Sequence, residues 1–219
     1  MSVFDPQRAR PVLQSFFARS TPTVARELLG AVLVSRVGGL LTAGEIVETE
    51  AYLGADDPGS HAATRGVTAR NRVMYGPPGH AYVYFTYGTH HMLNLVTEPE
   101  GVAGAVLVRA IRPILGIAAM SSRRGGRTGV DLTNGPGKLA SALGIDRSLN
   151  GVPLGDAIAV YKGAHIPLES VEVSGRIGLS GGHDLPLRFY VRGEEYVSNG
   201  RTGPRTPVRS RTSHTKGDS

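Results

Sequence analysis

The chain contains no cysteine, which excludes disulfide bonds and thiolate metal sites. It also has no long uninterrupted apolar run of the kind that forms a transmembrane helix. Arg8 and Arg10 near the start are not followed by the apolar segment of a secretion signal. We therefore expect a cytoplasmic protein with no membrane partner.

The length of 219 residues suits one domain with a sizeable core, and 40% hydrophobic and 19% charged residues are typical of a globular protein. The net charge of +6 is unevenly placed, because residues 199–219 hold five basic residues against one acidic residue. That stretch carries +4, which leaves only +2 for the rest of the chain. Rich in Arg, Ser, Thr, Pro and Gly, it cannot bury a core. We expect one domain over 1–198 and a disordered basic tail over 199–219.

Hydrophobic patterning predicts strands that cluster in the middle of the chain and helices that flank them. The expected helices are 13–17, 23–29, 114–122 and 138–143, with a short one near 69–74 in a long loop over 54–78. The expected strands are 31–37, 40–52, 81–87, 92–97, 105–111, 177–179 and 187–191, with Gly38 and Gly39 as a hairpin turn. Strands and helices do not alternate, so the pattern favours an α+β domain on an antiparallel sheet.

Aromatic and imidazole side chains gather between residues 52 and 91, which hold five of the eight tyrosines and four of the seven histidines. The same stretch contains Arg65, Arg70 and Arg72. Aromatic faces stack nucleic-acid bases and guanidinium groups bind phosphates, so the combination fits recognition of a single base. Tyr82 and Tyr84 also alternate with apolar residues, as in any half-buried strand, so a purely structural role stays open.

Glu50 is an unusual residue for an apolar strand, because a buried carboxylate needs partners or a proton. It could form a salt bridge, face solvent or act as a general base. Glu48 shares a strand face with Glu50 and Ile46, so an enzyme with paired carboxylates is an alternative. Asp56 and Asp57 lie in the predicted loop, and neither is an obvious second carboxylate.

A group of histidines and an arginine-rich segment could form two further sites. His61, His80, His90 and His91 could suggest a metal, but adjacent histidines on a strand point to opposite faces and there is no HExxH motif. We therefore expect no metal and no cofactor. The segment 123–127, with the sequence RRGGR, could contact phosphate or form an exposed flexible loop.

Several motifs in one order resemble the alkyladenine (3-methylpurine) DNA glycosylase family. They are VETEAYLG at 47–54, His61, RNR at 70–72, YVYFTYG at 82–88, Asn94, VLVRA at 106–110, LTNGPGKL at 132–139, RIGL at 176–179 and PLRFYVRG at 186–193. The resemblance runs from about residue 16 to residue 198 and implies a compact single domain on a curved, mainly antiparallel sheet. It implies no metal or cofactor.

The resemblance also implies roles for single residues. Glu50 falls on the residue that deprotonates the attacking water, and Arg109, with a main-chain carbonyl near Leu179, falls on the groups that hold that water. The remaining roles are a base pocket of Tyr52, His61, Tyr84 and Asn94, a wedge at Tyr87 that enters the DNA stack, and backbone contacts at Thr68 and Arg70.

As a member of this family, the protein would bind duplex DNA containing damaged purines, as a monomer, in the cytoplasm or on a bacterial nucleoid. It would flip out 3-methyladenine, 7-methylguanine, hypoxanthine or ethenoadenine and hydrolyse the N-glycosidic bond, leaving an abasic site without cutting the backbone. The alternatives are a non-catalytic nucleic-acid binder of the same fold and a carbohydrate-directed glycosidase.

Overall fold

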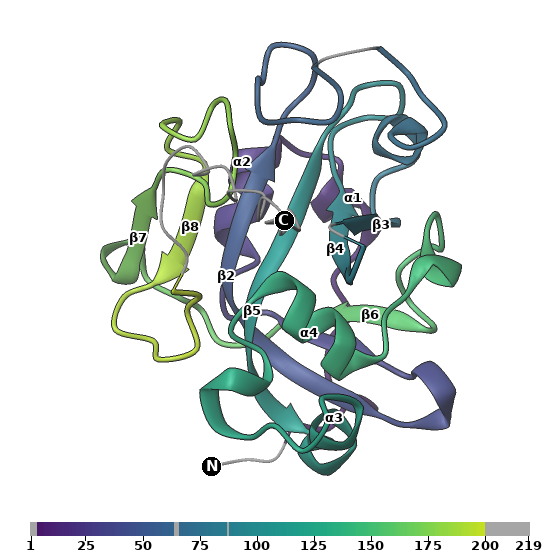
Figure 1. Cartoon of the computed structure of the whole chain (residues 1–219), viewed down its shortest axis with the longest axis vertical. Helices are drawn as coiled ribbons and strands as arrows, with labels where there is room; N and C mark the ends of the chain where they lie inside the picture. The colour runs from purple at the N-terminus through teal and green to yellow at the C-terminus, as the bar shows by residue number, and fades with distance from the viewer. Residues whose placement is uncertain (1–3, 64–65, 87, 200–219) are drawn as a thin grey trace, which may run out of the picture.

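Two long antiparallel strands, β2 (Thr42–Tyr52) and β5 (Ala105–Leu115), lie side by side at the centre of the molecule (Figure 1). The computed structural model describes residues 4–63, 66–86 and 88–199. Its other strands are β1 (Val32–Ser35), β3 (Ala81–Thr86), β4 (His90–Val96), β6 (Ile158–Tyr161), β7 (Val171–Ser174) and β8 (Arg188–Val191).

All eight strands belong to one sheet, in which every pairing is antiparallel. The main path runs β3-β4-β5-β2-β1-β6. Strand β2 pairs with β5 along one edge, whereas its other edge is shared by β1, at residues 42–45, and β8, at residues 48–50. The predicted α+β class is therefore confirmed.

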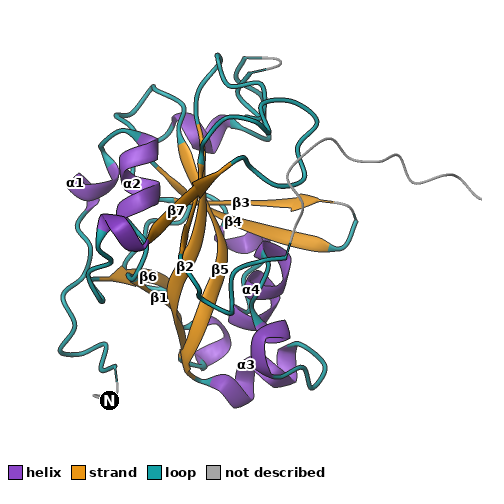
Figure 2. Cartoon of the chain, turned by 90° about the vertical axis from the view of Figure 1, so that its left-hand side faces the viewer, coloured by secondary structure: helices purple, strands orange, loops and turns teal. Residues whose placement is uncertain are grey.

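Short helices cover both sides of the central strands (Figure 2). They are α1 (Gln14–Phe17), α2 (Thr21–Glu27), α3 (Ile117–Arg123) and α4 (Pro136–Leu143), with 3₁₀ turns η1 (Val37–Gly39), η2 (Arg72–Tyr75), η3 (Gly129–Leu132), η4 (Arg147–Leu149) and η5 (Leu168–Ser170). In Figure 2, α1 and α2 lie on one side of β2 and β5, and α3 and α4 on the other. None of the helices in the described part of the chain has the length and apolar character needed to span a bilayer.

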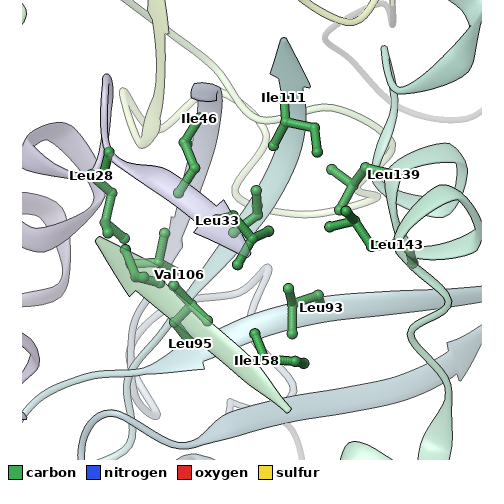
Figure 3. Packing of buried hydrophobic residues seen from close by; sticks show 14 of the residues in the cluster. Leu28, Leu33, Ile46, Leu93, Leu95, Val106, Ile111, Leu139, Leu143 and Ile158 are labelled. Carbon is green, nitrogen blue, oxygen red and sulfur yellow. The ribbon is translucent and has the colours of Figure 1, made fainter. Parts of the chain in front are cut away.

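The main core fills the space between the sheet and these helices (Figure 3). Leu28 follows α2, Leu33 comes from β1, Ile46 from β2 and Ile111 from β5, and all four are fully buried. Leu139 on α4 meets them from the far side. Because these side chains come from segments far apart in the sequence, their packing fixes the positions of β2 and β5.

Several predicted boundaries are wrong. The strand expected over 105–111 continues to Leu115, because Pro113 and Leu115 pair with Gly44 and Ala43. The helix expected from 114 starts only at Ile117, after Gly116 in the left-handed region at φ 73°. Gly38 and Gly39 lie in a 3₁₀ turn and not in a two-residue hairpin turn.

Other elements were missed or misassigned. Strands β6 and β7 were not predicted, and 177–179 forms no regular strand. The short helix expected near 69–74 is the 3₁₀ turn η2. These segments are short, and tertiary pairing decides whether they extend as strands.

The pairing of β2 with β5 is irregular at Glu48, the first of the two buried glutamates on β2. The register between β2 and β5 shifts on both sides of Glu48, from Ile46 to Glu48 and from Glu48 to Thr49. Such bulges re-aim side chains and often lie beside active sites. Here β8 pairs with the same stretch, opposite Glu48 and Glu50, so both glutamates are enclosed between β5 and β8.

Candidate active site

A cavity of about 260 Å³ opens beside the second half of β2. Five predicted site residues line it, namely Tyr52, His61, Tyr84, Asn94 and Arg109. The wall also includes Gly59, Met74, Tyr82, Thr86, Met92, Ala105, Leu107, Pro136, Ile177, Gly178 and Leu179. The structure thus brings together residues that are spread over more than half of the chain.

Glu50 lies immediately behind this wall and is fully buried. Its Oε1 accepts a hydrogen bond of 2.7 Å from the main-chain N–H of Ile177. Its Oε2 accepts one of 2.8 Å from the Tyr52 hydroxyl and lies 3.1 Å from Nη1 of Arg109. An ionised carboxylate accepts about four hydrogen bonds, so three donors leave room for a further one.

Glu48 is also fully buried, and both of its carboxylate oxygens already bind other side chains or main-chain groups of the protein. Its Oε1 lies 3.0 Å from Nε of Arg109 and 2.6 Å from Nε of Arg188. Ser198 donates its hydroxyl to Oε1 at 2.9 Å and its N–H to Oε2 at 2.7 Å. The role that this geometry gives Glu48 is to hold Arg109 against Glu50, which weakens the alternative of two catalytic carboxylates.

The charges of this cluster affect the neighbouring proton-bearing groups. Burial by itself lowers the pKa of Arg109, but the carboxylates of Glu50 and Glu48 outweigh it and raise that pKa above its ordinary value. Burial, and then the charge of Glu50, raise the pKa of Tyr52 well above its ordinary value. Arg109 therefore stays charged, and Tyr52 stays a protonated donor to Glu50.

Besides Tyr52, three rings that contact one another form the aromatic part of the cavity wall. The His61 and Tyr84 rings meet edge-to-face with centroids 4.6 Å apart, and Tyr82 lies 5.4 Å from Tyr84. Nδ1 of His61 is 3.0 Å from the Tyr82 hydroxyl. Burial, and then the charge of Arg70, lower the pKa of His61 to about 4, so its imidazole is neutral at physiological pH. Burial raises the pKa of Tyr82 to about 12, although Arg70 opposes this.

Asn94 is buried at the side of the cavity. Its Nδ2 donates to the main-chain carbonyl of Tyr82 at 3.0 Å across the β3–β4 pair. This bond holds the amide group in place, so Asn94 presents a rigid wall.

The predicted DNA-backbone residues lie close to this cavity but make internal contacts. The Arg70 guanidinium lies 5.2 Å from the centroid of the Tyr84 ring. Arg70 and Arg147 both line a neighbouring groove of about 420 Å³. The main-chain N–H of Thr68 donates to Oδ1 of Asn71 at 2.6 Å, which stabilises the turn before Arg70.

Three other parts of the sequence prediction concern the wedge and the tail, the arginine-rich segment and a metal site. Tyr87 and residues 200–219 lie outside the described residues. The arginines at 123–127 do not form a free phosphate loop, because Arg123 donates to the carbonyl of Val37 at 2.8 Å and Arg127 lies 3.7 Å from Asp131. In the part of the chain that the structure describes, no three His, Asp or Glu side chains are placed to hold a metal ion.

Sequence reasoning missed several residues of the site. Tyr82 was noted only as part of a strand pattern, yet it lines the cavity and contacts His61. Ser198 gave no signal, since a lone serine near the end of the domain has many uses. Arg176 belongs to a quoted motif, but its partner Asp57 lies 119 residues away.

A cavity walled by aromatic rings and backed by a buried carboxylate has the shape and chemistry that a planar base beside a hydrolytic group requires. The chain matches the family model described as methylpurine-DNA glycosylase over residues 15–195. It belongs to the methylpurine-DNA glycosylase family. It is accordingly a DNA-repair enzyme that hydrolyses N-glycosyl bonds in DNA.

Curated relatives agree with this family. A protein of Carboxydothermus hydrogenoformans is 48% identical over 187 residues, which cover 84% of this chain and 97% of that protein. One of Methanoculleus marisnigri is 50% identical over 188 residues, covering 84% and 96%. One of Chlorobaculum parvum is 47% identical over 190 residues, covering 86% and 90%. Each is named "Putative 3-methyladenine DNA glycosylase".

The low pKa of His61 predicts a pH dependence of stability. An unfolded histidine titrates near about 6.5, whereas folded His61 titrates at about 4. As the pH falls between these values, the unfolded chain takes up a proton that the folded chain does not, so the free energy of unfolding decreases. His61→Gln should lose this part of the decrease in urea denaturation at several pH values. An NMR titration that places the His61 pKa at its ordinary value would contradict the prediction.

Proposed function

We propose that this chain flips an alkylated or deaminated purine out of duplex DNA and hydrolyses its N-glycosidic bond with water activated by Glu50. The observation that carries the proposal is the setting of Glu50, directly behind the cavity wall with three donors on its carboxylate. A buried carboxylate that can still accept a further hydrogen bond is a suitable general base for a water molecule.

The cavity supports recognition of a flipped base. A base inside a duplex cannot reach a buried carboxylate, so it must leave the stack at a cost of a few kcal/mol, which is lower for damaged bases. Tyr52, His61 and Tyr84 offer faces and edges for a planar ring. Because His61 is neutral, it does not repel a cationic alkylpurine. Tyr87 would fill the vacated stack, and Arg70 and Thr68 would contact the backbone.

The hydrolysis needs one water molecule and no second carboxylate. Water held by Glu50, Arg109 and a carbonyl near Leu179 attacks the C1′ atom of the sugar as its N-glycosidic bond breaks, and Glu50 accepts the proton. A 3- or 7-alkylpurine already carries a positive charge and departs as a neutral base. Hypoxanthine and ethenoadenine are neutral and would have to be protonated as they leave. Asn94 would exclude the exocyclic amine of normal guanine.

The residues that line the cavity support a monofunctional enzyme. Cutting the DNA backbone after base loss requires an amine that forms a Schiff base with the sugar, usually a lysine. Of the described residues that line the cavity, none is a lysine. The expected product is therefore an intact strand with an abasic site, and the substrate is duplex DNA bound by a monomer.

The two rival functions fit the geometry less well. A non-catalytic binder would gain nothing from burying Glu50 against Arg109, because buried charge pairs are often no more stable than apolar replacements. A carbohydrate-directed glycosidase would need a second carboxylate facing the cavity, whereas Glu48 is bound to Arg188 and Ser198.

Glu50→Gln should reduce single-turnover base release from a lesion duplex by about 10²-fold or more, because the amide cannot accept the proton of water. Binding of the same duplex should stay within a few fold of wild type. The matched control is Glu45→Gln on the same strand, whose side chain pairs with Arg112 away from the cavity. Base release at the wild-type rate from Glu50→Gln would contradict the assignment of the base.

Tyr87→Ser should weaken binding to lesion duplexes much more than binding to undamaged single strands, because only the duplex has a stack to fill after flipping. Fluorescence anisotropy with the two DNAs measures both affinities. Equal losses on both DNAs would argue against a wedge at this position.

Deleting 199–219 removes a net charge of +4. The slope of log binding constant against log salt should become shallower by roughly one to four, because fewer counterions are released on binding. The choice among lesions should not change. A variant of full length with the five basic residues replaced by glutamine should behave like the deletion, and an unchanged slope would show that the tail does not contact DNA.

A further inference from the structure

Arg176 and Asp57 form a buried ion pair that is separate from the pairs of Glu48 and Glu50 with Arg109 and Arg188. Both side chains are fully buried, and Arg176 is among the largest side chains in the interior. Nη1 of Arg176 lies 2.6 Å from Oδ2 of Asp57 and Nη2 lies 2.5 Å from Oδ1, so the contact is bidentate. The same two nitrogens donate to the carbonyls of Ala51 at 2.9 Å and Gly182 at 3.0 Å.

This pair joins the loop that follows β2 to the segment between β7 and β8. Asp57 also accepts the main-chain N–H groups of Leu53 and Gly59, both at 2.9 Å, so it orders the loop that follows β2. Arg176 belongs to the segment between β7 and β8, whose next residues line the cavity. Because the fork of a guanidinium matches a carboxylate in only one plane, the pair fixes both position and orientation.

The pair contacts two of the three donors that hold Glu50. The Tyr52 hydroxyl binds Glu50, and the guanidinium of Arg176 lies 4.8 Å from the centroid of the Tyr52 ring. The N–H of Ile177, which immediately follows Arg176, is the donor to the other oxygen of Glu50.

Rotation of Arg176 would therefore disturb both of these hydrogen bonds, while the contact of Arg109 with Glu50 would be left in place. Neither Asp57 nor Arg176 is part of the cavity lining.

The packing around the guanidinium shows how closely its position is defined. A Cβ atom at Gly59 would come within 2.6 Å of both Nη2 of Arg176 and Cδ1 of Leu179. A Cβ at Gly182 would lie 2.9 Å from the same nitrogen. Only glycine at these positions lets the two loops close on Arg176.

We propose that Asp57 and Arg176 are positioning residues for Glu50, which hold Tyr52 and the Ile177 N–H in place so that the carboxylate keeps its orientation toward the water. This inference rests on the proposed function and assigns no chemistry to the pair itself. Hydrogen bonds to the charged form of a carboxylate lower its pKa. Loosening two of the hydrogen bonds that hold Glu50 should therefore move the acid limb of the pH dependence of base release upward.

Several charged or titratable groups surround Glu50 and can affect the pH profile of base release. They are Tyr52 and Glu48 on its own strand, Arg109 on β5, Arg188 on β8, Tyr84 on β3 and Arg176 behind Tyr52. Arg176→Lys keeps the positive charge but loses the planar fork, so it changes geometry and not charge. Gly59→Ala keeps both charged residues and displaces the guanidinium by steric contact.

The test measures single-turnover base release, lesion-duplex affinity and thermal unfolding for Arg176→Lys and Gly59→Ala, each at a temperature where the variant is folded. We expect base release about tenfold slower or more, affinity within about threefold of wild type, and an acid limb of the pH–rate profile moved up by about one pH unit. A role in stability alone would lower the unfolding temperature without moving the acid limb.

Two matched controls distinguish the pair from its surroundings. Gly54→Ala lies in the same loop as Gly59, but its Cβ would come no closer than 3.5 Å to a neighbour. Arg192→Lys changes the exposed ion pair between Arg192, which follows β8, and Glu172 on β7. Both should keep the wild-type rate and pH profile.

The outcomes separate this inference from the proposed function. If wild type releases no base, or Glu50→Gln releases it normally, the proposed function fails. If wild type is active and Glu50→Gln inactive, while folded Arg176→Lys or Gly59→Ala keeps the wild-type rate and acid limb, only the positioning role is overturned. Gly59→Ala keeps both charged residues and only displaces the guanidinium, so it provides the test if Arg176→Lys does not fold.

Discussion

The burial of two carboxylates on the central strand is the constraint on which the rest of the site depends. Glu48 and Glu50 are both removed from water, which is costly unless each negative charge is paired and hydrogen-bonded. Arg109 is shared by the two, so it links the structural carboxylate to the proposed catalytic one. Removing Arg109 would take one cation from each carboxylate, and Glu48 would keep Arg188.

The partners of these carboxylates explain much of the topology near the site. Donors arrive from β5, from β8, from the residue after Arg176 and from Ser198 at the end of the described chain. Two glutamates and two arginines, Arg109 and Arg188, balance in charge. This side of the cavity therefore carries no large excess of either sign.

The strand pattern made much of the fold predictable. Alternation and β-branched residues indicated β2, β3, β4 and the first part of β5, and the absence of alternation with helices indicated an antiparallel sheet. Short elements failed, because β6 and β7 each have four residues and exist through pairing with β1 and β8. The end of β5 was missed because a proline inside a strand favours the opposite interpretation.

The site, like the fold, was predictable from the sequence only in part. By itself, the sequence determined that an unusual glutamate stands in an apolar strand near a cluster of tyrosines, histidines and arginines, and the order of motifs pointed to the family. Only the tertiary structure decided which glutamate lies directly behind the cavity wall and which is bound by Arg188 and Ser198, since both lie on one strand two residues apart. It also decided that Asp57 and Arg176 are a pair. Their contact depends on loops closing across a distance in sequence that no local spacing encodes.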